Sequence, residues 1–230
     1  MGKRWAVLCA LLLAACTVPT PRPEAPHASP RAPQTMPTPG SFRIDPARSE
    51  LRLLVYRAGP LASFGHNHVM VNHDLTGTIR VASSIEASSF NLSIPVADFI
   101  VDDAKNRGEE GADFPGEISD SAREGTLHNM LSAPLLNGAA YPTIEVRAEQ
   151  LQETNGSLNA TVAIKIAGHE TSIEVPFVFD ATQRSLVVTA SFEIRQTEIG
   201  LTPLSLLGGA LQVRDALNVK MTLVAGAQAP

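Results

Sequence analysis

The sequence has no cysteine after residue 16. Its two cysteines, Cys9 and Cys16, lie close to the start of a chain of 230 residues. The remainder can therefore form no internal disulfide and no cysteine-ligated zinc site. Its fold must be held by an apolar core, and a hydrophobic content of 44% is enough to build one.

Aromatic and basic residues are also scarce. Aromatic residues make up 5% of the chain, and 23 acidic against 18 basic residues give a formal net charge of −5. Surfaces that bind nucleic acid need clustered positive charge and often stacked aromatic rings. We therefore expect no nucleic-acid partner.

Sequence signatures of catalysis are missing as well. The chain has no Gly-x-Ser-x-Gly elbow, no dinucleotide fingerprint and no phosphate-cradling glycine loop, so we expect a protein that is not an enzyme. Acidic residues at 102–103, at 109–110 and at Asp113 could do acid–base work or bind Ca²⁺ weakly. We interpret them as a solvated charged run, with residues 106–115 forming a mobile loop.

The N-terminus has the layout of a secretory signal. Lys3 and Arg4 precede a short apolar run, Trp5–Ala15, which is too short to span a bilayer. The run ends in Leu-Ala-Ala-Cys, which resembles the bacterial lipobox, so we expect residues 1–15 to be removed and Cys16 to carry acyl chains such as palmitate. An ordinary signal peptide with an incidental cysteine is the alternative.

Since several acyl chains anchor a protein stably, the predicted location is the cell envelope, membrane-bound and facing the periplasm. By resemblance to enterobacterial lipoproteins, Thr17 favours the outer membrane.

A proline-rich stretch follows the lipobox. Eight of the 24 residues in 17–40 are proline, which excludes a helix or a central strand. We interpret residues 16–41 as the lipidated cysteine and an extended tether that holds a folded domain off the membrane.

From Phe42 onward, apolar residues alternate with polar ones. The clearest sets are Leu51, Leu53 and Val55; Phe90, Leu92, Ile94 and Val96; Ile144, Val146 and Ala148; Leu158, Ala160, Val162, Ile164 and Ile166; Ile173, Val175, Phe177 and Phe179; Leu186, Val188, Ala190, Phe192 and Ile194; Leu217, Val219, Met221 and Leu223. Alternation of period two predicts antiparallel strands with one buried face. Turns are expected at Asn155-Gly156, Gly168-His169 and Thr182-Gln183. The pattern predicts about eight to ten strands, in a closed barrel or a sandwich.

Two stretches interrupt the alternation. Residues 97–108 read as a short helix or loop. Residues 116–133 have a loosely helical spacing of apolar side chains, and a helix there could lie across the mouth of a barrel.

Several segments resemble YceI-like domains. They are Phe42-Arg43-Ile44-Asp45-Pro46 with Ser49, Tyr141-Pro142-Thr143-Ile144, the paired strands Ala160–Phe179, and Glu198-Ile199-Gly200-Leu201 through Gly208-Gly209-Ala210-Leu211 to Val213-Arg214-Asp215. The resemblance places a YceI-like domain at residues 42–226. It implies an all-β fold, an extended antiparallel lipocalin-like barrel of about eight strands with one or two short helices. It also implies a periplasmic protein with a long apolar channel that takes a polyisoprenoid, quinone-like or fatty-acyl chain.

We therefore expect a protein that binds or carries an apolar small molecule, with no cofactor other than a bound isoprenoid or fatty-acyl lipid. Its expected partners are that ligand and the membrane, and the sequence names no protein partner. Inward residues are mostly aliphatic, which permits a cavity. The alternatives are a structural or interaction domain with a filled barrel and a histidine-based metal-binding protein.

The segment Phe64-Gly65-His66-Asn67-His68 departs from the family pattern. In a strand, His66 and His68 would share a face, and they could hold Zn²⁺ or Cu²⁺ if His128, His169, Asp74 or a glutamate supplied a third ligand. His73 would point to the opposite face. The commoner interpretation is hydrogen bonding near a barrel end. In a third interpretation, His66, His68, His128 and Asn129 contact the polar head of a ligand whose tail lies inside the barrel. We predict no metal site, with His66 and His68 as weak candidates.

Overall fold

The computed structural model describes residues 36–228. Strands predominate, and they are β1 (Gly40–Ile44), β2 (Glu50–Ala58), β3 (His68–Asn72), β4 (Thr76–Val81), β5 (Ser89–Pro95), β6 (Ile100–Val101), β7 (Thr143–Thr154), β8 (Ser157–Ile166), β9 (His169–Ala181), β10 (Ser185–Arg195), β11 (Ser205–Leu206) and β12 (Leu211–Ala227). The helices are α1 (Ala104–Glu109) and α2 (Asp120–Leu131), with short 3₁₀ turns η1 (Pro46–Arg48), η2 (Ala62–Phe64), η3 (Val96–Asp98), η4 (Gly111–Asp113), η5 (Gln196–Ile199) and η6 (Leu207–Gly209).

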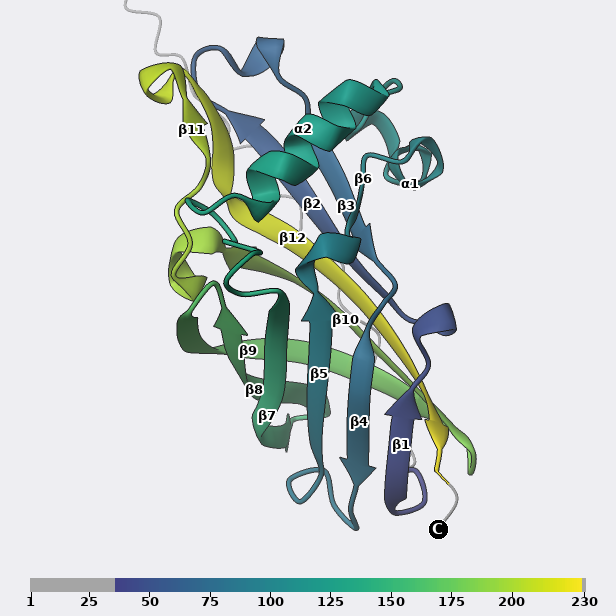
Figure 1. Ribbon diagram of the computed structural model, residues 1–230. Coiled ribbons are helices and arrows are strands. Elements are labelled where there is room, and N and C mark those ends of the chain that lie inside the picture. The colour runs from purple at the N-terminus through teal and green to yellow at the C-terminus, as the bar shows by residue number, and fades with distance from the viewer. Residues whose placement is uncertain (1–35, 229–230) are drawn as a thin grey trace, which may run out of the picture. The chain divides into compact units, whose positions relative to one another are not determined.

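Eight strands form a closed antiparallel barrel (Figure 1). Their order around the ring is β1-β4-β5-β7-β8-β9-β10-β12, and β12 returns to β1. The closing contact is short, with Phe42 opposite Ala227 and Ile44 opposite Ala225. This closure selects the barrel over the sandwich and confirms the expected all-β fold with two short helices.

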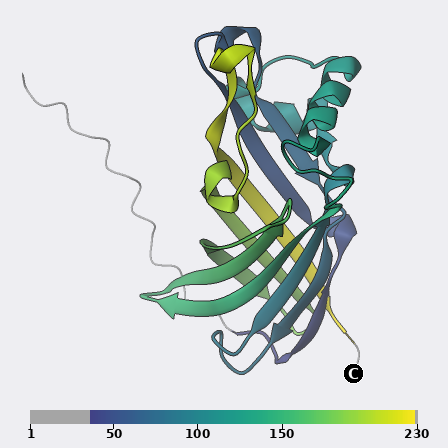
Figure 2. The same cartoon turned by 60° about the vertical axis from the view of Figure 1, so that its left-hand side comes forward.

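Strand β12 has 17 residues and extends beyond the closed ring. Its C-terminal end pairs with β1, and from Gln212 to Thr222 it pairs with β2. Strands β2, β3 and β6 are hydrogen-bonded side by side and form an upper tier of the same sheet. Figure 2 shows this tier above the ring, with α2 beside it. Along the chain, the strands of this tier alternate with strands of the ring, since β2 follows β1, β4 follows β3, and β6 follows β5.

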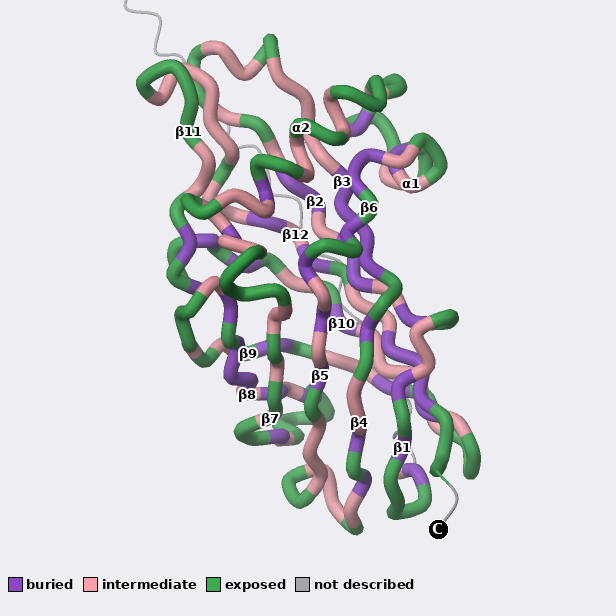
Figure 3. The backbone as a smooth tube through the Cα atoms, viewed as in Figure 1, coloured by how far each residue is buried: buried purple, intermediate pink, exposed green. Residues whose placement is uncertain are grey.

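The alternation read from the sequence is confirmed strand by strand. The predicted inward sets on β2, β8, β9, β10 and β12 line the barrel interior, apart from Leu158, which is buried in the core, and most of their residues are buried. Figure 3 shows buried positions recurring on several of the strands, among them β4, β5 and β12. The interior therefore consists of aliphatic side chains with a few phenylalanines.

The predicted turn position is confirmed at one hairpin, and at the next hairpin the turn lies one residue earlier than predicted. Asn155 and Gly156 join β7 to β8 with φ values of 52° and 78°, as a tight hairpin turn requires. Between β8 and β9 the turn residues are Ala167 and Gly168, with φ values of 48° and 82°. The prediction of Gly168-His169 is off by one residue because His169 already pairs with Ile166.

The helix expected within residues 116–133 is α2, and Ser119 caps its N-terminus. The expectation of a mobile loop at residues 106–115 is wrong. That stretch contains the end of α1 and η4, and Phe114 packs against Leu54, Val69 and Val71 on the outer face of β2 and β3. An apolar anchor thus fixes a segment whose composition looks solvated.

The end of the expected tether packs against the folded body. Pro37 is buried and Met36 packs against the main core, although both fall within the expected tether. The signal peptide, Cys16 and most of the tether lie outside the described residues. Within the described part of the chain, no helix has the length and apolar character needed to cross a bilayer.

Candidate functional site

The barrel encloses a cavity of about 500 Å³. Leu186 and Ile194 lie eight residues apart on β10 and both line it. At about 3.4 Å per residue, these two positions are up to about 27 Å apart along the strand, so the cavity is elongated. This shape suits an elongated ligand, and its volume lies in the range of pockets that take drug-sized molecules.

The cavity lining is strongly apolar. Its polar side chains are Arg57, His66, His68, Ser88, Thr126, Asn129, Gln196 and Gln212. Most of them gather at the end formed by the upper tier and α2. Phe64, which is largely exposed, lines the cavity at the same end. The cavity is therefore asymmetric, with an apolar body and one polar end.

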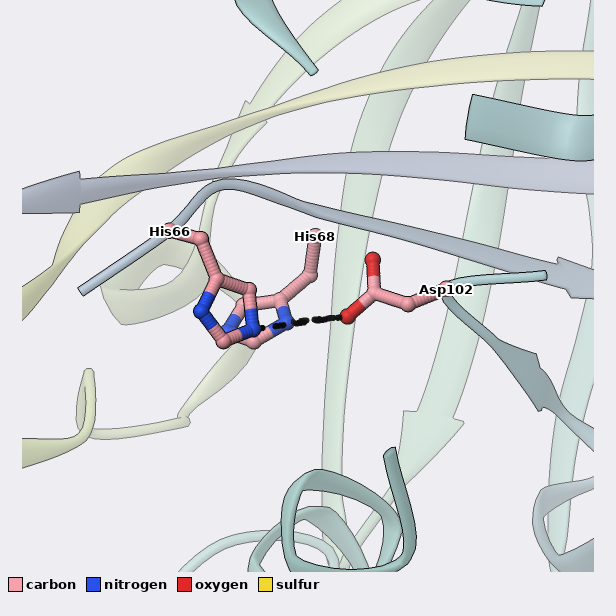
Figure 4. Close-up of side chains that lie close together, drawn as sticks. All are labelled: His66, His68 and Asp102. Carbon is pink, nitrogen blue, oxygen red and sulfur yellow. Dashed lines mark hydrogen bonds and ion pairs between the residues drawn. The ribbon is translucent and has the colours of Figure 1, made fainter. Parts of the chain in front are cut away.

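Three side chains form the centre of the polar end, and Figure 4 shows them converging. Asp102 Oδ2 lies 2.7 Å from His68 Nδ1 and 3.8 Å from His66 Nε2. The two imidazole rings meet edge to face, with centroids 4.5 Å apart. We call His66, His68 and Asp102 the His-His-Asp cluster.

Pairing between β3 and β6 positions Asp102. Val101 is opposite Met70, so the next residue, Asp102, falls beside Val69 at the start of β3. The Val69 amide donates to Asp102 Oδ1 at 2.9 Å, and Asp102 has a positive φ of 52°. Its Oδ2 is thereby directed at the two histidines.

Arg107 holds the other side of the carboxylate. Its Nη1 donates to Asp102 Oδ1 at 2.6 Å, and its side chain is 1% exposed. The same guanidinium donates to the backbone carbonyls of Asn67, Pro115 and Gly116. Arg107 therefore joins the segment before β3, the carboxylate and the η4 segment into one rigid unit.

The electrostatics of the cluster follow from these contacts. Burial alone would raise the pKa of Asp102, but hydrogen bonds from His68, from the Val69 amide and from Arg107 outweigh it and lower the pKa. Burial and the neighbouring His68 lower the pKa of His66, against the opposing attraction of Asp102. At neutral pH, Asp102 is therefore a carboxylate and His66 a neutral imidazole.

His66 has an unused ring nitrogen. Its Nε2 is buried and makes no hydrogen bond, while its side chain as a whole is 35% exposed. Buried polar atoms are nearly always paired, so this nitrogen is available to a ligand group or an ion. The cluster can donate or accept a hydrogen bond at the cavity wall.

The structure brings together three of the four ligand-binding residues predicted from the sequence. His66, His68 and Asn129 line the cavity, whereas His128 is exposed on α2 and is not part of the lining. His73 lies away from the cluster, with its Nδ1 3.1 Å from the carbonyl oxygen of Ser49. His66 precedes β3 and is not in the strand as the face argument assumed.

Sequence reasoning missed Asp102 and Arg107. It interpreted the acidic run as solvated, which is wrong for Asp102 and also for Glu110, which pairs with Arg52 at 2.9 Å and Lys220 at 2.6 Å. One signal was present, since Asp103 is the N-cap of α1. An N-cap residue marks the start of a helix, so Asp102 falls between the end of β6 and the start of α1.

Comparison with known proteins gives a family and a fold. The model of the YceI-like domain family matches residues 42–225. A crystal structure of BcnA from Burkholderia cenocepacia is similar at a TM-score of 0.58 and 14% identity, covering 79% of this chain and 98% of that one. The structure of a polyisoprenoid binding domain from Saccharophagus degradans, described as implicated in plant cell wall breakdown, is similar at a TM-score of 0.53 and 12% identity, covering 83% of this chain and 100% of that one. No curated protein matches.

We predict that Arg107→Met lowers the free energy of unfolding by about 3–5 kcal/mol, because it leaves the Asp102 carboxylate buried without its guanidinium. Urea denaturation measures the change. The double variant Asp102→Asn/Arg107→Met should lose less than the sum of the two single changes. Arg147→Met, which removes an exposed ion pair with Glu170, is the control and should change little. Equal losses in Arg107→Met and Arg147→Met would contradict the assigned role.

Acid should weaken the fold in part through Asp102. Its pKa is lower in the folded than in the unfolded chain. Its contribution is therefore present above the unfolded pKa of about 3.9 and is lost as pH falls through the folded value. Urea unfolding at a series of pH values should show the difference in stability between the wild type and Asp102→Asn shrinking below about pH 4. A difference that does not depend on pH would refute this.

Proposed function

The chain belongs to the YceI-like domain family, and on that basis we propose that it is a cell-envelope lipoprotein that holds one long apolar molecule inside its barrel. The observation that carries the proposal is the cavity of about 500 Å³, with its long aliphatic lining. Transfer of an apolar chain from water into such a lining is favourable by about 25 cal/mol per Å² of buried surface. Binding therefore needs no specific polar contact along the tail.

The ligand we propose is a polyisoprenoid, quinone-like or fatty-acyl chain. An elongated cavity is better matched by an extended chain than by a compact ring system. The structural relative described as a polyisoprenoid binding domain supports this choice. The tail would occupy the barrel and the head would lie near His66, His68 and Asn129, where hydrogen-bonding partners are available.

Binding is better supported than catalysis or a filled barrel. His68 and Asp102 resemble the base and orienting acid of a catalytic triad, but a nucleophile must lie within hydrogen-bond reach of the base. The hydroxyl side chains of the lining are Ser88, which donates to Ser84, and Thr126, which donates to Ala122. The cavity itself counts against a barrel filled by its own side chains.

We further propose that Cys16 is the anchor and that the domain works in the periplasm at the outer membrane. The lipobox resemblance and Thr17 support this location. Residues 17–36 are 20 in number, and a polyproline-like chain of that length would reach about 60 Å. The domain could thus turn its polar end toward a membrane and still remain attached.

The cavity proposal predicts a loss of bound lipid when the barrel is filled. Ala190→Phe places a ring in the lining, whereas Ser191→Phe places the same ring on the exposed neighbour on β10. Full-length protein would be purified in mild detergent and moved into discs of one synthetic phospholipid. Organic extraction and mass spectrometry would then identify any other bound lipid.

We expect about one long-chain lipid per wild-type and Ser191→Phe molecule, and several-fold less in Ala190→Phe. Thermal melting checks that each variant is folded, and Ala160→Leu is a milder second filling variant. Equal lipid content in all of these proteins, or none in the wild type, would overturn the proposal.

The anchor proposal predicts that Cys16→Ser abolishes incorporation of an alkyne-labelled palmitate and moves the protein out of the membrane fraction. Cys9→Ser is the matched control, because Cys9 lies within the predicted signal and should leave both labelling and membrane location unchanged. Fractionation and blotting for the label measure both outcomes. Continued labelling of Cys16→Ser would show that the lipobox interpretation is wrong.

A further inference from the structure

We propose that the His-His-Asp cluster is a binding site for one divalent transition-metal ion such as Zn²⁺. The ligands are His66 Nε2, the His68 ring nitrogen that faces the carboxylate, and Asp102 Oδ2. The site stands on its own residues, independently of the apolar ligand. It would add an inorganic centre to the polar end of the cavity.

The geometry of the cluster is close to that of a metal site. One ligand atom from each residue lies within 4.8 Å of the other two. Ligands at 2.0–2.1 Å around a tetrahedral zinc ion are about 3.3 Å apart. The separations from Asp102 Oδ2 are 2.7 Å to His68 and 3.8 Å to His66, so shifts of roughly half an ångström would bring both to this spacing.

His66 is the one member of the cluster that lies in a segment between strands and has a ring nitrogen that makes no hydrogen bond. His68 begins β3, and Asp102 is held by two hydrogen bonds to Oδ1. His66 belongs to the segment before β3, and its Nε2 is buried without a hydrogen-bond partner. A metal ion would satisfy this atom and would replace the hydrogen bond between His68 and Asp102.

The surroundings of the carboxylate resemble those of a metal ligand. Ligating carboxylates are usually hydrogen-bonded on the oxygen that does not bind the metal. Asp102 Oδ1 accepts from the Val69 amide and from Arg107, which leaves Oδ2 for the site. The fold thus supplies one carboxylate oxygen in a fixed direction beside two imidazoles.

Arg107 also decides which ions the site prefers. It shares the charge of Asp102, so the carboxylate alone would hold a cation weakly and the two imidazoles must supply much of the affinity. Imidazole suits Zn²⁺, Co²⁺, Ni²⁺ and Cu²⁺, whereas Mg²⁺ and Ca²⁺ prefer several oxygen ligands. His66 and His68 line the cavity and Asp102 does not, so the open side of the ion would face the cavity.

Cobalt titration of the full-length protein in non-ionic detergent tests the site. After treatment with a chelator and its removal, Co²⁺ is added and visible absorption bands report the number of ions and their coordination. We expect one ion per chain with the strong bands of four- or five-fold coordination. Zn²⁺ should displace it, and a large excess of Mg²⁺ or Ca²⁺ should not.

Variants assign the ligands. His66→Ala and His68→Ala should each weaken Co²⁺ binding by roughly 100-fold or more, while His128→Ala, an exposed histidine outside the cavity, should bind as the wild type does. Circular dichroism checks the fold, and X-ray absorption of the zinc-loaded wild type should independently show two imidazoles with oxygen ligands. The proposal fails if the wild type shows no saturable binding at millimolar Co²⁺, or if His66→Ala and His68→Ala bind as His128→Ala does. Neither result would alter the lipid measurements.

Discussion

The long strand β12 is the constraint on which the rest of the molecule depends. Its C-terminal end closes the ring against β1, and its N-terminal part carries β2 and, through β2, the strands β3 and β6. A shorter strand could close the ring or carry the upper tier, but not both. The barrel body and the polar end are therefore two consequences of one continuous strand, which also explains why segments far apart in the sequence meet at the site.

The ring forms the apolar cavity, and the upper tier positions the polar side chains at its end. In the ring, period-two alternation directs aliphatic side chains inward, and these are too small to fill the space between opposite walls. In the upper tier, β6 is short and ends at Val101, so the chain can turn there and present Asp102 to β3. A longer β6 would continue the ladder and leave no room for a carboxylate beside His68.

Much of the fold could be predicted from the sequence, because strand alternation is a local signal. The inward sets on β8, β9 and β10 were predicted residue by residue, as was the turn at Asn155-Gly156. Of the residues that form the candidate site, the sequence predicted the two histidines but not the aspartate or the arginine. His66 and His68 attract notice by their spacing, whereas Asp102 and Arg107 become site residues through pairing between β3 and β6, which lie about 30 residues apart. The composition of residues 102–113 predicts a solvated loop, because it does not reveal that Phe114 packs against β2 and β3 and holds the segment in place.

The buried pair of Asp102 and Arg107 is better explained by orientation than by stability. Removing two charges from water costs several kcal/mol per ion, and an apolar pair of similar size often serves stability as well or better. The pair instead fixes one carboxylate oxygen in the direction of two histidines at the cavity wall. That asymmetry also orients a ligand. A polar head at the apolar end would lose its hydrogen bonds to water at a cost of roughly 1–3 kcal/mol or more, whereas at the upper end it finds donors and acceptors. On the proposed function, the head of the ligand would therefore lie beside His66 and His68, and its tail would run down the barrel toward the ring closed by β1 and β12.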